Sequence, residues 1–481
     1  MLPLAEAKPV HARWSEANRD FLEFVERNPA YLSRDSFASL RAERSLRKLP
    51  LQSWPLFAGA PQRAEVEGVA LGIDRLMKSI YERFLHNDPA RLMEFYRSNL
   101  PLPEDTEEDN FIALNLNQEF AELLLQEPTG IQGALSRADY IETRDGLQCI
   151  EYNAGGFIGG LQTGIIGDLY LETPAVAHFL RERNLRARSP DTLGALFRHL
   201  VEDTARIGAW RGGEFNVAVV AHPHEPDQVA LHSAEVYTRE LRRTLAATGT
   251  APGGRVFVCG AEDLVGEADS LTLEGHPVHV VIEQHDGSAD LRQVFWHFKQ
   301  GQVNFFSGPV SVILCDKRNL ALVSEHAGSD EFTAQERGLI ERHVPWTRRV
   351  LPARTTFRGR ALRLPDDLPE HREELVLKKA TSFGGCEVHI GRFRTDEQWK
   401  RSIGRALREE DWIVQEYLET VPYCFQSGEV GVARHDLVWG LFAFGNHFGG
   451  AFLRLQPTAG SAGVVNTRQG AEVSVLLELE E

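Results

Sequence analysis

The sequence predicts a mixed α/β (α+β) protein in which helices, a small parallel sheet and antiparallel strand pairs follow one another along the chain. Three patterns indicate this fold class. Apolar residues recur at three- and four-residue spacing before residue 130, as in amphipathic helices. Between 211 and 300, short apolar runs alternate with a helical pattern, the order that builds a parallel sheet. Beyond 374, strand-like runs are interrupted by glycine-rich turns.

The composition is that of a folded, acidic protein with more than one structural unit. The chain has 481 residues, of which 42% are hydrophobic and 25% charged. A formal net charge of −17 argues against a protein that coats nucleic acid, although an aminoacyl-tRNA partner stays open. The five cysteines show no CxxC spacing, which favours a reducing compartment.

No sequence feature points to a membrane or to export. The N-terminal segment lacks an apolar leader, and no uninterrupted apolar run reaches membrane-spanning length. We therefore expect a soluble cytoplasmic protein without a membrane partner. The oligomeric state stays open.

We expect four regions along the chain. Residues 1–134 are mainly helical, 135–210 begin with a hairpin and continue into helices, 211–300 form a small parallel α/β unit, and 301–481 hold the remaining strands. Helices are expected at 64–85, 111–126, 160–184, 193–207, 233–249 and 317–327. Strands are expected at 215–222, 255–260, 276–284, 310–316, 411–419 and 437–456, and as a strand, loop and strand at 374–391.

Residues 137–160 predict a β-hairpin followed by a glycine run. The segment 144–146 (Arg-Asp-Gly) has the chemistry of a three-residue turn, with Gly146 where a positive φ is needed. The expected facing pairs are Thr143 with Leu147, Ile141 with Cys149 and Asp139 with Glu151. The glycines that follow would let a ligand approach the main chain closely.

Three polar side chains of this hairpin gather on one face. Asp139 and Glu151 face each other, and Asn153 lies two residues on, on the same side of its strand. Carboxylate and carboxamide oxygens are the hard ligands that Mg²⁺ prefers beside a phosphate-bearing substrate. The hairpin therefore predicts a Mg²⁺ site; the alternative is a sheet face whose polar residues meet water.

A phosphate-binding element is predicted at 374–391. Lys378 ends an apolar strand, and a loop that contains Ser382, Gly384 and Gly385 follows it. A lysine at this position can reach a phosphate, while main-chain N–H groups of the glycines cover the terminal phosphate. The alternative is a hairpin whose lysine extends into water.

Other residues also fit a nucleotide. Gln415, Glu416 and Tyr417 on one apolar strand offer the donors and acceptors that an adenine edge requires. Lys317, at a strand-to-helix junction, is a second candidate for the phosphates, and Arg454 is a candidate cation for a transferring phosphoryl group. The GxxxxGK[ST], GxSxG and HExxH motifs are absent, which removes the most common NTPase and hydrolase signatures.

This combination resembles the nucleotide site of the ATP-grasp enzymes: a lysine-bearing strand, a glycine loop and an apolar strand that ends in Gln-Glu-Tyr. In most of these enzymes the metal-binding Glu-x-Asn lies downstream of that strand, whereas Glu151 and Asn153 lie far upstream. The inverted order is similar to the circularly permuted branch, which includes eukaryotic-type glutathione synthetase and glutathionylspermidine synthetase. The spacing of Asp139, Glu151 and Asn153 is similar to the metal triad of the latter, and IEYNAGGFIGG resembles a segment of the former.

The resemblance implies a circularly permuted ATP-grasp fold with ATP and Mg²⁺ as cofactors. Residues 135–210 would be its metal-binding part, 211–300 a Rossmann-like substrate domain, and 301–481 the nucleotide-binding part with a glycine-rich lid. By the same resemblance, Arg137 would face the acyl-phosphate or the substrate carboxylate, and Asn466 would belong to a closing loop.

Two departures from the family pattern leave the substrates open. Ser382 stands in the region where glutathione synthetase has a metal-binding Glu in its glycine loop. Cys386 stands where a basic residue often follows the glycine pair. Both argue against glutathione synthetase itself.

The expected function is an ATP-dependent carboxylate–amine ligase that forms an amide or peptide bond through an acyl-phosphate. Its substrates would be small-molecule or peptide carboxylates and amines. One alternative is an ATP-grasp phosphotransferase, or a donor of acyl-phosphate to a nucleophile other than an amine. The other alternative is a non-catalytic ATP-binding protein.

Overall fold

The computed structural model describes residues 4–33, 49–86, 88, 91, 133–156, 158–221, 228–250, 252–284, 291–306, 313–382, 384–428, 431–459 and 463–480. The helix expected at 111–126 lies outside these residues. None of the described helices has the length and apolar composition needed to cross a bilayer.

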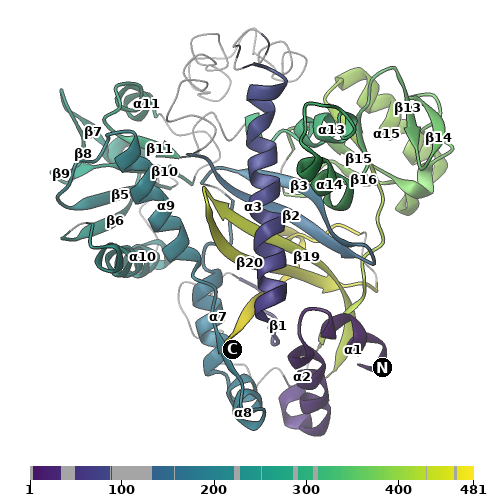
Figure 1. The fold of residues 1–481 in the computed structure, drawn as a ribbon, viewed down its shortest axis with the longest axis horizontal. Helices are drawn as coiled ribbons and strands as arrows, with labels where there is room; N and C mark the ends of the chain where they lie inside the picture. Colours follow the sequence, from purple (N-terminus) through teal and green to yellow (C-terminus); the bar gives the residue numbers. More distant parts are fainter. Residues whose placement is uncertain are drawn as a thin grey trace.

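The centre of the molecule is an eight-stranded sheet (Figure 1). Its strand order is β1-β21-β20-β19-β2-β3, with β18 paired to β19 and β4 paired to β21. These strands are β1 (Leu56–Ala58), β2 (Leu135–Thr143), β3 (Gly146–Ala154), β4 (Arg186–Arg188), β18 (Tyr423–Gln426), β19 (Val432–Phe444), β20 (His447–Pro457) and β21 (Glu472–Glu480). Because β2 pairs antiparallel with β19, the predicted hairpin lies directly beside strands from the far end of the chain.

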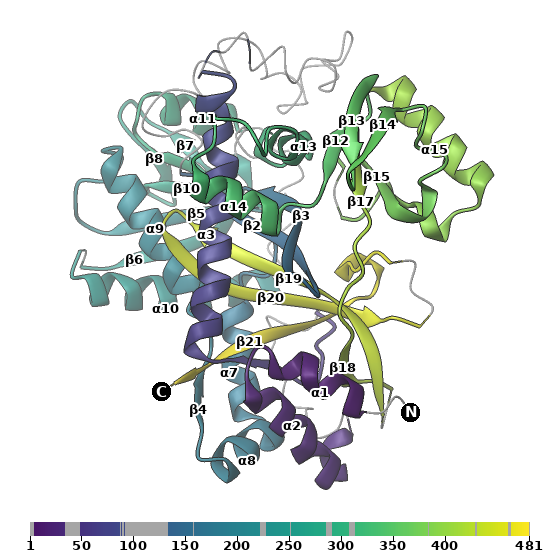
Figure 2. The same cartoon turned by 45° about the vertical axis from the view of Figure 1, so that its right-hand side comes forward.

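One long helix crosses a face of this sheet. α3 (Ala60–Arg83) contacts β2, β19 and β20, and both views show it running across them (Figures 1 and 2). Val66, Val69, Ile73, Leu76 and Met77 are buried along its inner side at three- and four-residue spacing. The helix expected at 64–85 is confirmed.

Shorter helices complete the layers around the sheet. They are α1 (Leu4–Ala12), α2 (Glu16–Arg27), α7 (Thr163–Glu172), α8 (Pro174–Glu182), α9 (Thr192–Arg206), α13 (Arg318–Glu325) and α14 (Ala334–His343). The segment expected as one helix at 160–184 is divided into α7 and α8. Pro174 starts the second helix, because proline fits the first turn but cannot continue a helix.

A small parallel sheet is present, as expected, but it extends past residue 300 to a strand at 304–306 that was not predicted. It has the order β11-β10-β5-β6, and all three pairings are parallel. Its elements are β5 (Phe215–Val220), α10 (Gln228–Thr248), β6 (Gly254–Cys259), β10 (Val280–Glu283), α11 (Arg292–Lys299) and β11 (Asn304–Phe306). A three-stranded antiparallel sheet, β7 (Val265–Gly266), β8 (Leu271–Leu273) and β9 (His276–Val278), is attached to it.

A third unit bears the predicted phosphate-binding element (Figure 2). Its antiparallel sheet has the order β12-β17-β15-β16, with β12 (Thr347–Arg349), β15 (Leu375–Lys379), β16 (Val388–Ile390) and β17 (Trp412–Glu416). α15 (Asp396–Glu409) covers it, starting at a capping box between Thr395 and Gln398. The hairpin of β13 (Ala353–Phe357) and β14 (Arg360–Leu364) completes the unit.

Two of the three predicted facing pairs of the hairpin are wrong. Thr143 pairs with Gly146, not with Leu147, and Ile141 pairs with Gln148, not with Cys149, because the turn has two residues rather than three. A bulge then shifts the register between Asp139 and Tyr140, which restores the expected pairing of Asp139 with Glu151.

The strand expected at 310–316 is also wrong within its described part. Ile313 and Leu314 are helical, and Lys317 ends a turn that leads into α13. A short apolar run does not distinguish a strand from a buried helical turn, because either can place every residue in the core.

Candidate functional site

A cavity of about 290 Å³ lies between the β12–β17 sheet and the central sheet. Predicted site residues that line it are Asp139, Glu151, Lys378, Gly385, Gln415, Glu416, Tyr417, Arg454 and Asn466. The other predicted residues, Arg137, Asn153, Lys317, Ser382 and Gly384, do not line the cavity. The volume is at the lower end of the range for small-molecule sites.

Apolar side chains also line the cavity, and none of them was predicted as a site residue. The walls come from Ile141, Ile150, Val376, Val388, Ile390, Phe393, Leu418, Leu437, Val438, Val464 and Val465. Val376 could have been predicted from the sequence, because it lies two residues before Lys378 and therefore shares its face of β15. The walls supplied by β19 and by 463–466 depend on tertiary contacts.

Lys378 extends from β15 toward the hairpin. Its Nζ donates to the carbonyl oxygen of Ile150 at 2.9 Å and to Oε1 of Gln415 at 2.6 Å. Burial lowers the pKa of Lys378 to about 8, and the nearby carboxylate of Glu151 offsets part of this effect. The lysine therefore lies within the protein, and the alternative of a side chain extended into water is excluded.

The strand predicted to contact adenine lines the cavity, but its polar groups have protein partners. The side-chain amide of Gln415 accepts from Lys378 and donates to Thr347 Oγ1 at 3.1 Å. The main-chain N–H groups of Glu416 and Tyr417 donate to carbonyl oxygens in neighbouring segments. Among the described residues, no acceptor pairs with the N–H of Leu418, which is at the cavity wall.

Lys317 connects the glycine loop to the hairpin. Its Nζ donates to the carbonyl oxygen of Ser382 at 2.5 Å and forms an ion pair of 3.0 Å with Oε1 of Glu151. Its main-chain N–H donates to the carbonyl oxygen of Ala380. The lysine is 4% exposed. It therefore holds the start of the loop beside the hairpin.

Asp139 is the centre of a buried charged group. Its Oδ1 accepts from Arg137 Nε at 3.1 Å and lies 2.7 Å from Arg454 Nη2, and its Oδ2 accepts from Asn153 Nδ2 at 3.2 Å. Burial alone would raise the pKa of Asp139, but the two guanidinium groups outweigh burial and hold the pKa below its usual value. The carboxylate is therefore ionised and strongly held.

Arg137 fits closely between main-chain segments. Its Nη1 donates to the carbonyl oxygens of Ile158 and Gly159. A Cβ atom at Gly440 would lie 2.8 Å from Arg137 Cδ, so a glycine is required there for the guanidinium to reach Asp139.

The predicted metal ligands are gathered in one place. Asp139 pairs with Glu151 across the hairpin, and Asn153 contacts Asp139. Glu151 is paired with Lys317, and Asp139 with two arginines. No group of three His, Cys, Asp or Glu side chains suited to a metal occurs in the described ranges. The Mg²⁺ site thus stays a prediction, which would use two carboxylates and one amide.

The cavity also presents a buried cationic group with free hydrogen-bonding capacity. Nε of Arg454 is buried and has no hydrogen-bond acceptor among the described residues. Leaving such a donor unsatisfied costs about 1–3 kcal/mol, and an acceptor on a ligand or a water molecule would remove this cost. This observation fits an anionic ligand such as a polyphosphate at this end of the cavity.

The glycine loop meets the segment 463–469 over the cavity. Gly384 and Gly385 both have positive φ, 68° and 73°. A Cβ atom at Gly385 would lie 2.8 Å from Val464 Cγ1 and 3.7 Å from Asn466 Cβ. Asn466 therefore lies beside the glycine loop, and its part in a closing loop stays a prediction.

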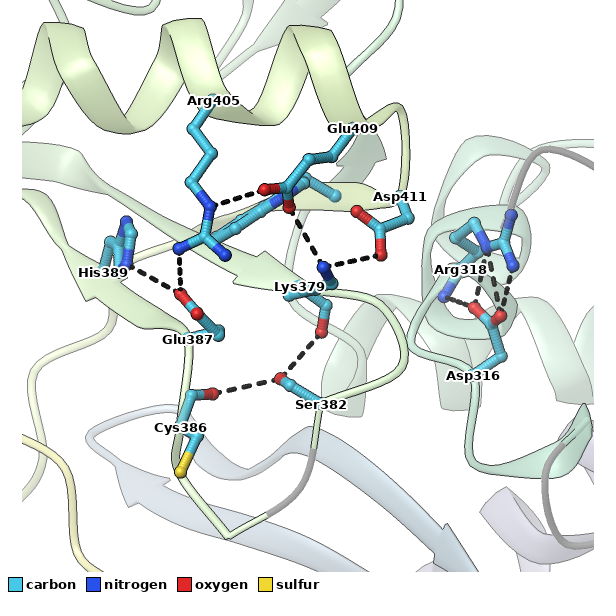
Figure 3. A network of polar contacts seen from close by, with 11 residues as sticks. Asp316, Arg318, Lys379, Ser382, Cys386, Glu387, His389, Arg405, Glu409 and Asp411 are labelled. Atoms are coloured by element: carbon cyan, nitrogen blue, oxygen red, sulfur yellow. Dashed lines mark hydrogen bonds and ion pairs between the residues drawn. The ribbon is translucent and has the colours of Figure 1, made fainter. Parts of the chain in front are cut away.

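Lys379 follows Lys378 in β15, so its side chain lies on the opposite face of the strand. It pairs with Glu409 at 3.1 Å and Asp411 at 3.4 Å (Figure 3). Glu387, at the other end of the loop, pairs with Arg405 of α15 at 2.7 Å. The Ser382 hydroxyl lies within hydrogen-bond distance of the carbonyl oxygens of Lys379 and Cys386, which closes the loop on itself. The residues that flank the loop, Lys379 and Glu387, are therefore each held by an ion pair to α15.

A polar group near the apolar walls was missed in the sequence. Asp436 accepts from Thr420 Oγ1 at 3.2 Å and from Thr458 Oγ1 at 3.1 Å, and all three residues line the cavity. They come from three separate segments, so no local signal joins them. The cavity thus has polar groups beside its apolar walls as well as at its charged end.

The described residues thus form a mixed α/β architecture with this cavity between two of its sheets. Among solved structures, the chain is similar to a glutathione synthetase-like effector from Globodera pallida in its apo form. The identity is 14%, the match covers 89% of this chain and 90% of that chain, and the TM-score is 0.52. No family model and no curated protein matches the sequence. At this identity the likeness concerns the fold alone.

Proposed function

We propose that the protein is an ATP-dependent carboxylate–amine ligase. The observation that supports this most directly is the composition of the cavity. Apolar walls suit a flat base, while Lys378 and Arg454 at the charged end suit phosphates, and Asp139 and Glu151 lie beside them. The glutathione synthetase-like fold of the structural neighbour agrees with a ligase.

In the proposed reaction, a substrate carboxylate attacks the terminal phosphate of ATP, and ADP leaves. An amine then attacks the acyl-phosphate, an amide bond forms, and phosphate is released with loss of a proton from nitrogen. Lys378 and Lys317 would hold the phosphates, and Arg137 and Arg454 would stabilise the negative charge that develops at the reacting oxygens. Leu418 N–H would donate to the base.

The proposal includes a Mg²⁺ site formed by Asp139, Glu151 and Asn153. Bound Mg²⁺ would neutralise charge on the phosphate oxygens. To bind it, Asp139 would exchange contacts with its arginines and Glu151 would exchange its contact with Lys317. The order of the motifs and the spacing of this triad support the circularly permuted branch, close in kind to glutathionylspermidine synthetase.

A second candidate is a non-catalytic ATP-binding protein. It is favoured by the same ion pairs, because both predicted metal-binding carboxylates are already neutralised by protein cations. The experiment must therefore distinguish a non-catalytic ATP-binding protein from a ligase. A phosphotransferase to a non-amine nucleophile is separated by the same assay.

The test is ADP release from ATP and Mg²⁺, screened against pools of amino acids, peptides and polyamines, with mass spectrometry of the products. We expect release that requires both a carboxylate and an amine. Release with a carboxylate and no amine requirement would favour the phosphotransferase. Tight ATP binding without turnover in any pool would favour the non-catalytic protein.

Lys378 and Lys379 offer a matched pair of variants. Lys378→Met should reduce ATP binding by more than about tenfold, because it removes one of the buried cations that line the cavity. Lys379→Met removes an equal charge that faces Glu409 and Asp411 outside the cavity, so ATP binding should stay unchanged (Figure 3). Equal effects of the two substitutions would contradict the assignment.

A further inference from the structure

A buried polar cluster lies behind the hairpin, on the side opposite the cavity. Oδ1 of Asp74, in α3, accepts from Ser136 Oγ at 2.6 Å and from the Tyr152 hydroxyl at 2.7 Å. Oδ2 of Asp74 pairs with Lys78 Nζ at 2.9 Å. The same Nζ donates to the carbonyl oxygen of Ala134 at 2.7 Å. One helix is thereby bonded to both strands of the hairpin.

This cluster is not explained by stability alone. Asp74 and Lys78 are each 2% exposed. A buried ion pair seldom stabilises a fold more than apolar residues of the same volume, because both charges lose their hydration. What the pair supplies instead is a defined geometry, since charged hydrogen bonds are directional and costly to break.

The geometry concerns the buried charged group around Asp139 and its partner across the hairpin, Glu151. Ser136 is next to Arg137, and Tyr152 lies between Glu151 and Asn153. Successive side chains of a strand point to opposite faces, so each contact to Asp74 fixes the backbone directly beneath a residue of the site. Because the single carboxylate of Asp74 accepts hydrogen bonds from both strands, it also fixes the position of one strand along the other.

The hairpin needs such support at this place. The register shifts between Asp139 and Tyr140, so the ladder of main-chain hydrogen bonds is interrupted beside the charged group. A bulge leaves one residue unpaired, bends its strand and increases the local twist. The contacts to Asp74 restrain both strands close to the bulge.

We infer that Asp74 and Lys78 are positioning residues, which act through Tyr152 and Ser136 on the placement of Asp139, Glu151 and Asn153. They touch neither the cavity nor a ligand. The expected effect on metal and nucleotide binding rests on the proposed function. The expected effect on the geometry of the hairpin rests on the contacts of Asp74 and Lys78 alone.

The hairpin contains a matched control for the test. Tyr152 and Tyr140 are both fully buried, but the Tyr140 hydroxyl has no hydrogen-bond partner in the described part of the chain. Tyr152→Phe therefore removes the hydrogen bond to Asp74, whereas Tyr140→Phe removes a hydroxyl group without breaking a hydrogen bond. Asp74→Asn provides a second variant of the cluster.

The experiment has two measurements on the full chain. Amide hydrogen exchange without ligand should be about tenfold faster at 146–154 in Tyr152→Phe and Asp74→Asn than in the wild type, and unchanged in Tyr140→Phe. The dissociation constant for Mn²⁺–ATP should rise about tenfold in the first two variants only, while the constant for adenosine stays the same.

Equal exchange rates in Tyr152→Phe and Tyr140→Phe would overturn the inference. So would faster exchange with an unchanged Mn²⁺–ATP constant in a protein that binds Mn²⁺–ATP. If the wild type binds no Mn²⁺–ATP, the proposed function fails, and the exchange rates then decide the positioning role by themselves.

Discussion

The ammonium group of Lys378 donates to the carbonyl oxygen of Ile150 at 2.9 Å, and Ile150 is the extra residue of the bulge in the hairpin. Beyond the bulge Tyr140 pairs with Cys149, and before it Asp139 pairs with Glu151, so Ile150 has no partner across the hairpin. The irregular residue thus presents its carbonyl group to the lysine. This contact joins the two halves of the candidate site.

The affinity for ATP should fall as the pH rises above about 8. The pKa of the buried Lys378 is about 8, so at higher pH the free protein holds a neutral amine. Phosphate favours the charged form, and binding must then take up a proton, which weakens it by up to about tenfold per pH unit. Calorimetry at pH 7 and pH 9, in buffers of different ionisation enthalpy, measures both the affinity and the proton uptake.

The control for this prediction is Lys378→Arg. An arginine keeps its charge throughout this pH range, so the variant should bind ATP without the pH dependence above 8, whatever its absolute affinity. If the affinity for ATP falls equally with pH in the variant and in the wild type, a group other than Lys378 causes the pH dependence.

Asp139→Asn should destabilise the fold by about 3 kcal/mol. The substitution leaves Arg137 and Arg454 buried beside a neutral group, and an unpaired buried charge is costly. Urea unfolding followed by circular dichroism measures the change. Asp145→Asn, in the exposed turn of the same hairpin, should change the free energy of unfolding by less than about 0.5 kcal/mol. A loss below 1 kcal/mol for Asp139→Asn would mean that the ion pairs contribute little.

Arg454→Gln should strengthen the binding of Mn²⁺ to the protein without nucleotide, by several-fold. In the wild type, Arg454 competes for the carboxylate of Asp139, and its removal lowers the positive potential at the predicted metal site. Electron paramagnetic resonance of free Mn²⁺ measures the affinity. Arg392→Gln serves as the control, since Arg392 lies over the Tyr417 ring and pairs with Glu419. Unchanged Mn²⁺ affinity in Arg454→Gln would count against Asp139 as a ligand.

Gly385→Ala should weaken ATP binding, whereas Gly428→Ala should not. Both glycines have positive φ, so alanine introduces backbone strain of about 1 kcal/mol at either position. Only at Gly385 would the new Cβ also meet a neighbour, Val464 Cγ1 at 2.8 Å, and push the two loops over the cavity apart. Nucleotide titrations and thermal unfolding of both variants separate the two effects. Equal losses of affinity would show that strain, not the contact between the loops, is responsible.

Local patterns identified many of the polar residues that line the cavity, but not the contacts that these residues make. Lys378 could be found because it ends an apolar strand beside a glycine loop. The contact between Lys378 and the carbonyl group of Ile150 could not be predicted, because the bulge has no sequence signature. The register was expected to be regular, and the turn was placed one residue too long. The shorter turn shifts the register by one residue, and the bulge shifts it back by one. The pairing of Asp139 with Glu151 was therefore still predicted correctly.

By itself, the sequence determined the mixed α/β class, the small parallel sheet and the polar face of the hairpin. Each of these depends on interactions within a short segment, namely hydrophobic periodicity and strand alternation. Only the tertiary structure decided which cations neutralise Asp139 and Glu151, and that Asp74 supports the hairpin from behind. Those contacts join residues far apart in the chain, such as Asp139 with Arg454, and they form only because packing of the whole core brings their strands side by side.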